Sequence, residues 1–128
     1  MTKDDALIDL CKAFLDDPRL VSQPEWQKLV LIGEVGNGST EIFGYSYDLD
    51  GRGKLTAPSN GISTDKMLAL HGLMKSENPN GRGWLKCMIR ISRAGEIGAD
   101  FEYNDPKRWE HTTDNYLERI KEYATLAV

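Results

Sequence analysis

The chain has 128 residues, the size of one domain with a single hydrophobic core. Hydrophobic residues make up 40% of it and charged residues 28%, which excludes a chain kept disordered by charge repulsion. Sixteen Lys and Arg oppose twenty Asp and Glu, and the formal net charge of -4 disfavours direct binding of nucleic acid. We expect a single domain over residues 1–128, whose mild acidic excess supports solubility and would also suit a basic protein partner.

The amino terminus and the cysteines favour the cytoplasm. Residues 1–5 contain no apolar stretch of signal-peptide length, and the longest aliphatic run, residues 29–32, is too short to span a bilayer. Cys11 and Cys87 stand in apolar patterns without paired spacing, which indicates buried structural thiols. We therefore expect a cytoplasmic protein that has no membrane contact.

The first predicted element is a helix over residues 3–16. Apolar residues recur at helical spacing between Leu7 and Leu15. Thr2 and Asp5 can form a capping box before them, and Pro18 ends the segment. Acidic residues in the last turn oppose the helix dipole, so we expect its carboxyl end to fray.

A tight hairpin follows the first helix. Residues 26–35 and 40–48 are rich in β-branched, aromatic and aliphatic side chains, and Asn37-Gly38 between them is a strong hairpin signal. With those two residues as the loop, Ile32 faces Phe43 across the strands. Both faces are partly apolar, which predicts a central strand.

The middle of the chain combines a turn-rich stretch with a second helix. Residues 48–59 have a turn-forming composition that allows one further short strand at 54–57. Ser63 is predicted to cap a helix over residues 64–76, and residues 78–81 stop it. Its apolar face would carry Met67, Leu70, His71 and Met74.

A second hairpin with one buried face is predicted from strict alternation over residues 85–92 and 97–103. A loop of two residues would mix the buried and exposed faces, so the loop must be odd in length. The expected loop is Ala94-Gly95-Glu96, in which Gly95 is free to take a positive φ. This register sets Ile91 beside Ala99, Ile89 beside Phe101 and Arg90 beside Asp100.

The last predicted element is a helix after Pro106, capped by Thr113. Its buried face would carry Leu117, Ile120, Ala124 and Ala127, flanked by Tyr116 and Tyr123. The element order α-ββ-α-ββ-α joins neighbouring strands by hairpins. It predicts an α+β fold in which an antiparallel sheet of four to five strands packs against helices.

No catalytic or metal-binding motif stands out, and we expect no metal and no cofactor. His71 and His111 have no Cys or second His at metal-ligand spacing. The run from Asp48 to Gly53 suits an Asp-Gly turn better than a calcium loop, because Ala57 would stand where the loop needs an acid. Asp100 and Glu102 share one strand face, which is typical of solvated strands as well as of paired catalytic carboxylates.

Acidic residues and one aromatic-cationic pair form the predicted docking surface. An exposed Trp beside Arg is a common interface anchor, although we slightly favour a core position for Trp109, packing the last helix onto the sheet. The candidate partner-binding residues are Asp48, Asp50, Asp100, Glu102, Asp105, Arg108 and Trp109. Such a surface would meet a basic partner that otherwise contacts nucleic-acid phosphate.

The run Phe101-Glu102-Tyr103-Asn104-Asp105-Pro106-Lys107-Arg108-Trp109, with Trp84, the Ile89/Ile91 strand and Gly95 before it, resembles the YezG-like family of bacterial immunity proteins. The likeness covers residues 84–120 and, more weakly, the hairpin at 26–47, whereas residues 48–83 have no match. The resemblance implies a cytosolic antitoxin that binds a cognate toxin domain, often a nuclease, in contact-dependent growth inhibition or polymorphic toxin systems. It implies nothing about the target, because toxin-facing surfaces differ between cognate pairs.

We carry three function classes forward. An immunity protein that neutralises a toxin by stoichiometric binding ranks first, and no enzyme activity is expected of it. A cytosolic protein-binding adaptor or homo-oligomeric scaffold ranks second. A small hydrolase that uses Asp100, Glu102 or His71 ranks third.

Overall fold

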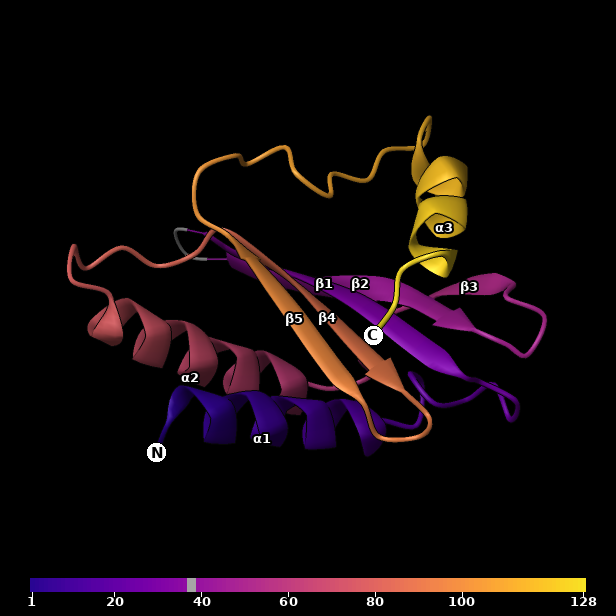
Figure 1. Ribbon diagram of the computed structural model, residues 1–128, viewed down its shortest axis with the longest axis horizontal. Helices are drawn as coiled ribbons and strands as arrows, with labels where there is room; N and C mark the ends of the chain where they lie inside the picture. Colours follow the sequence, from indigo (N-terminus) through magenta and orange to yellow (C-terminus); the bar gives the residue numbers. More distant parts are fainter. Residues whose placement is uncertain (37–38) are drawn as a thin grey trace.

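A five-stranded antiparallel sheet with helices on both faces forms the protein (Figure 1). The computed structural model describes residues 1–36 and 39–128, and none of the helices in them has the length and apolar character needed to cross a bilayer. The elements are α1 (Lys3–Leu15), β1 (Lys28–Gly36), β2 (Ser39–Tyr47), β3 (Gly53–Thr56), α2 (Ile62–Glu77), β4 (Lys86–Ser92), β5 (Ile97–Glu102) and α3 (Tyr116–Ala124). The α+β fold, the element order and the fifth short strand are as predicted.

Strand β1 lies at the centre of the sheet, whose order is β3-β2-β1-β4-β5. Its partners are antiparallel, and Ile32 pairs with Phe43 in the predicted register. Four successive residues, Leu29 to Ile32, are at most 1% exposed, because both faces of β1 are covered. The predicted central strand is therefore confirmed and is β1, whereas the predicted Asn37-Gly38 turn lies outside the described residues.

Helices α1 and α2 lie side by side on one face of the sheet (Figure 1). The predicted capping box starts α1, since the amide of Asp5 donates to the Thr2 hydroxyl and the amide of Thr2 to the Asp5 carboxylate. Cys11 and Cys87 are buried free thiols in this layer, and burial raises the pKa of each to about 12. Their predicted structural role is confirmed.

Helix α2 begins two residues earlier than predicted and without Ser63 as its cap. Gly61 precedes the first turn, and the amide of Ile62 donates to the side-chain oxygen of Asn60. Ser63 is 1% exposed, and its hydroxyl has no hydrogen-bond partner among the described residues. The prediction was wrong because the turn before the helix already supplies the start signal, which leaves Ser63 inside the first turn.

The second hairpin has the predicted odd loop but a different register. Ile91 pairs with Ile97, so the loop is Arg93-Ala94-Gly95 and the predicted pairing with Ala99 is wrong. The amide of Gly95 donates to the carbonyl of Ser92, and Gly95 has a φ of 99°. In three-residue loops the left-handed position is the last one, and glycine therefore sets the end of the loop.

The α3 face of the sheet is also covered, which corrects the expectation of a single buried face for the second hairpin. Met88 and Lys86 on this face of β4 are 2% and 4% exposed. Helix α3 packs here through Ile120 and Tyr123, whereas Leu117 is 60% exposed and does not lie on its buried face. Thr113 is not the cap: the Thr112 hydroxyl accepts from the amides of Asp114 and Asn115.

Polar side chains on this face of the sheet donate hydrogen bonds to backbone carbonyls of the C-terminal segment, residues 103–128. The Lys28 ammonium donates to the carbonyls of Tyr123, Ala124 and Leu126 at 2.8, 3.1 and 2.8 Å. It thereby caps the carboxyl end of α3, where free carbonyls favour a cation. The remaining bonds join Tyr47 to Ile120, Lys86 to Arg108 and Arg90 to Ala127.

Replacing Lys28 with Met keeps most of the side chain's apolar length and removes its three hydrogen bonds. We expect the free energy of unfolding to fall by about 1.5–3 kcal/mol, the usual range for a bond to a charged group. Relative to the native protein, hydrogen exchange should accelerate more at the amides of α3 than at those of α1. Thermal unfolding and exchange mass spectrometry measure both effects.

Lys54→Met is the matched control, because Lys54 is an exposed strand lysine whose side chain makes no hydrogen bond within the described residues. Equal melting temperatures for the two variants would contradict the capping role of Lys28.

Candidate functional site

A groove of about 850 Å³ opens on the α3 side of the sheet. Strands β1, β2 and β3 form its floor, and residues 109–116 form its wall. Apolar and aromatic side chains dominate the lining, with three carboxylates and two cations among them. The apolar and aromatic side chains include Ile32, Phe43, Tyr45, Leu55, Trp109, His111 and Tyr116, and the charged ones are Glu34, Glu41, Glu110, Arg19 and Lys86.

Hydrogen bonds among its own residues hold the wall. The amide of Thr112 donates to the Asn115 side-chain oxygen at 2.8 Å, and the Thr112 hydroxyl accepts the amide of Asn115 in return. The carbonyl of Glu110 accepts from the side chains of Asn115 and Arg119. The segment has little regular secondary structure, so these bonds, together with the anchor at Trp109, give the wall its shape.

Trp109 anchors the wall in the core. It is 9% exposed and has a φ of 58°, a conformation that is rare for a bulky side chain. The bond from Lys86 to the carbonyl of Arg108 and the Arg108 guanidinium, 4.3 Å from the indole centroid, hold it in place. The favoured core position for Trp109 is therefore confirmed, and the same ring also lines the groove.

His111 belongs to the wall and packs against three aromatic rings. Its centroid is 4.6 Å from that of Phe43, 5.5 Å from Tyr45 and 5.7 Å from Tyr123. Its Nδ1 donates to the carbonyl of Trp109 at 2.7 Å, and its buried Nε2 has no partner among the described residues. Burial, opposed by the bond to Trp109, lowers the pKa of His111 below its ordinary value, so the neutral ring is favoured.

His71 is also bonded to the backbone. Its Nε2 donates to the carbonyl of Trp84 at 2.9 Å, and the ring meets the Trp84 ring edge-on. It is half-buried, as predicted for a satisfied histidine on the apolar side of a helix. In the part of the chain that the structure describes, no group of three His, Cys, Asp or Glu could hold a metal ion.

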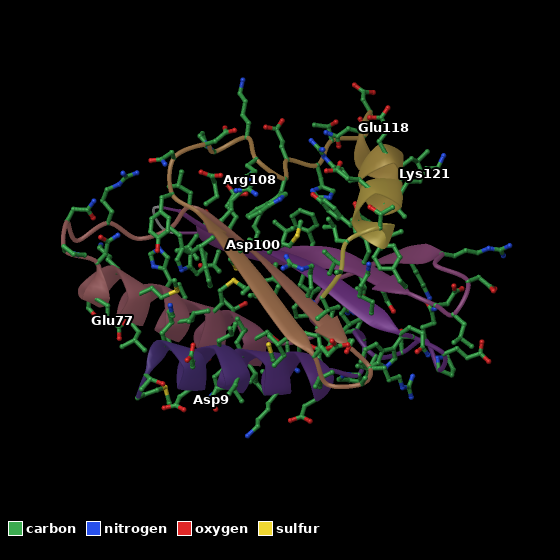
Figure 2. All side chains as sticks on the ribbon, in the orientation of Figure 1. Asp9, Glu77, Asp100, Arg108, Glu118 and Lys121 are labelled. Carbon is green, nitrogen blue, oxygen red and sulfur yellow. The ribbon has the colours of Figure 1, made fainter. Side chains whose placement is uncertain are left out.

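Three of the predicted partner-binding acids lie together around Arg108, but two of them are paired with arginines. Asp100 forms an ion pair with Arg90 at 2.7 Å, and Glu102 one with Arg108 at 3.0 Å. The amide of Asn104, then Arg108 and the amide of Asp105, hold the pKa of Glu102 down to about 2. Glu102 thereby holds the turn after β5, whereas Asp100 lies on β5 itself beside β4, and Figure 2 labels Asp100 over the strands and Arg108 on the segment that follows.

Asp48 and Asp50 lie away from that group. They occupy the turn between β2 and β3, where Asp48 accepts the amides of Asp50 and Arg52 in the predicted Asp-Gly turn. This turn follows Tyr47, which pairs with Lys28 at the start of β1. Glu102 pairs with Lys86, which in turn pairs with Glu34 near the opposite end of β1, so Glu102 lies two strands away from β1 at that end of the sheet. A single acidic surface that joins all five predicted acids is therefore wrong, because they occupy opposite corners of the sheet.

Two acids that were not predicted lie in the groove. Glu34 and Glu41 are direct cross-strand partners, are exposed and line the groove. Neither forms an ion pair with any described residue. The Asn37-Gly38 hairpin register already sets them opposite each other on the face of Ile32, so the sequence held this signal. The wall that turns this face into a groove left no comparable local signal.

A comparison with protein-family models and a search of curated proteins found no match to this chain. The resemblance to the YezG-like immunity proteins therefore stays a prediction that depends on the residues of the 101–109 run.

The neutral His111 predicts a pH dependence of stability. Its pKa in the folded state lies below the ordinary histidine value of 6.5, so the unfolded chain binds the proton more readily as pH falls. The stabilisation is present above about pH 6.5 and is lost as pH falls towards the folded pKa. Urea unfolding of the native protein and of His111→Gln should give a smaller decline for the variant between about pH 7 and pH 5. Parallel declines would contradict a buried neutral His111.

Proposed function

We propose that this chain is an immunity protein that binds a cognate toxin domain, a nuclease, and neutralises it by stoichiometric protein binding. The observation that carries the proposal is the preformed groove with three carboxylates free of ion pairs among the described residues, Glu34, Glu41 and Glu110. A nuclease must present basic side chains to nucleic-acid phosphate, and such a surface is complementary to this groove. The resemblance of residues 101–109 to the YezG-like family supports the same function.

The residues that carry the resemblance have structural tasks around the groove. Glu102 and Arg108 form the turn after β5, and Trp109 anchors the wall. The unpaired carboxylates Glu34 and Glu41 lie outside that run. A division between a shared scaffold and individual contact residues is what a family of cognate inhibitors needs, since each member must reject other toxins.

Exposed apolar side chains beside the groove would extend the contact. Leu55 and Tyr116 in the lining are 59% and 40% exposed, and Leu117 on α3 is 60% exposed. Stable complexes bury about 800 Å² per partner, more than a groove alone supplies. A preformed wall reduces the ordering cost of binding, and the carboxylates would steer the encounter.

Co-expression with the product of the neighbouring reading frame tests this function. We expect a one-to-one complex on co-purification, rescue of cell growth, and an affinity that weakens as salt is raised. Failure of both complex formation and rescue would overturn the proposal. A stable self-assembled oligomer without a toxin complex would instead support the homo-oligomeric scaffold, which exposed Leu49, Leu55 and Leu117 would then serve.

A further inference from the structure

We infer that the groove binds an arginine side chain of the partner protein, with the guanidinium held between Glu34, Glu41 and the aromatic lining. The inference rests on the proposed function for the identity of the partner as a toxin and goes further in naming the anchoring group. Four features of the groove support it: the carboxylate pair, the ring-rich lining, an unpartnered hydroxyl at the floor, and the size of the space.

The carboxylate pair is the first feature. Glu34 and Glu41 are opposite each other on neighbouring strands, where like charges destabilise a sheet. Lys86 is the cross-strand neighbour of Glu34 on the other side, but its ammonium donates to the carbonyl of Arg108 instead. Arg19, the other cation of the lining, forms no ion pair in the described part of the chain. The two carboxylates are thus left as acceptors for a cation from outside.

Rings make up much of the remaining lining. Phe43, Tyr45, Trp109, His111 and Tyr116 all contribute to it. Aromatic faces attract cations, and a flat guanidinium can stack on them while its edge donates to carboxylates. The protein already uses this stacking, since Arg108 lies over the ring of Trp109 and Arg93 over that of Trp26.

The floor holds a hydroxyl that lacks a partner. Tyr45 is 0% exposed, lines the groove, and its hydroxyl makes no hydrogen bond with any described residue. Such a buried polar group is costly, because it has lost water and gained nothing in return. A ligand with several donors that reaches this hydroxyl would supply the missing bond.

Arginine fits this combination better than other cations. A guanidinium has five donors and no acceptor, and it bonds to two carboxylates in one plane, whereas an ammonium is a strongly hydrated point charge. A metal ion is a poorer fit, because no group of three metal-ligating side chains exists among the described residues. The volume of about 850 Å³ exceeds one arginine side chain, so residues that flank the arginine would enter as well.

The test titrates the isotopically labelled full-length protein with N-acetyl-arginine methylamide and follows its amide resonances. We expect saturable shifts centred on β1, β2 and residues 109–113. N-acetyl-citrulline methylamide has nearly the same shape without the charge and should produce no saturable shift. The lysine analogue should bind more weakly than the arginine one. Absence of saturable shifts at the groove, or equal binding of the citrulline or lysine analogue, would overturn the inference.

The decisive variant is Glu34→Gln with Glu41→Gln. Its affinity for the arginine probe should fall by at least about tenfold, because both charge-assisted contacts are lost. Its melting temperature should be equal to or above that of the native protein, since the like-charge pair is removed. This stability measurement separates a lost site from a lost fold. Unchanged affinity for the probe would overturn the inference.

Asp9→Asn with Glu77→Gln is the matched control. Like the decisive variant, it removes two negative charges, but from helices α1 and α2, on the opposite side of the sheet from Arg108 (Figure 2). Its affinity for the probe should equal that of the native protein, and an equal loss in both double variants would reduce the effect to net charge and overturn the inference.

The probe titration needs no toxin, so the two proposals can fail separately. Probe binding without toxin rescue would remove the immunity function and leave the arginine site standing. If the protein rescues cells from the toxin, and the Glu34/Glu41 double variant binds that toxin with the same affinity as the native protein, the arginine site is ruled out and the immunity function stands. Concentration-dependent dimerisation that the double variant abolishes, with no probe binding, would assign the groove to a second copy of this chain and overturn the inference.

Discussion

Hydrogen bonds from side chains of the sheet to backbone carbonyls hold the C-terminal segment, residues 103–128, on one face of the sheet. Strand β1 is buried on both faces, so the sheet needs a cover on each side. On one side two helices of 13 and 16 residues supply it, but on the other the cover is a 9-residue helix with long irregular flanks. A helix that short is marginal alone. The ammonium of Lys28 and the hydroxyl of Tyr47 satisfy its carbonyls from below, and Lys86 holds the segment before it.

The groove follows from this arrangement. Residues 103–115 contain no helix or strand and are held at a few points, and the part of them from residue 109 onward, with Tyr116, forms the wall of the groove. The anchor at Trp109 requires a positive φ, and the ring of His111 fills the space beside it without a charge. Among the described residues, the buried Tyr45 hydroxyl and the Nε2 of His111 have no hydrogen-bond partner in this part of the protein.

Charges divide into two groups with different tasks. Asp100 and Glu102 are paired with arginines and serve the fold, which is why their acidity is a poor guide to a docking surface. Glu34 and Glu41 face each other without a counter-ion in the described residues, at a cost to the sheet. Under the proposed function that cost is offset when a basic partner binds. The arginine side chain is the partner group that matches carboxylates beside aromatic rings.

Local sequence signals predicted the first helix, the first hairpin and its register, because a capping box and an Asn-Gly pair between two apolar runs are readable within a few residues. The same reasoning placed Ile91 of the second hairpin beside Ala99, two residues beyond its actual partner Ile97, because Gly95 is the last residue of the hairpin loop and not its central one. The tertiary structure alone decided that α3 covers a second face, that Lys28 caps it from 95 residues away, and that Glu34 and Glu41 lie in a groove. Such contacts join distant segments through side chains, and no periodicity or spacing along the chain records them.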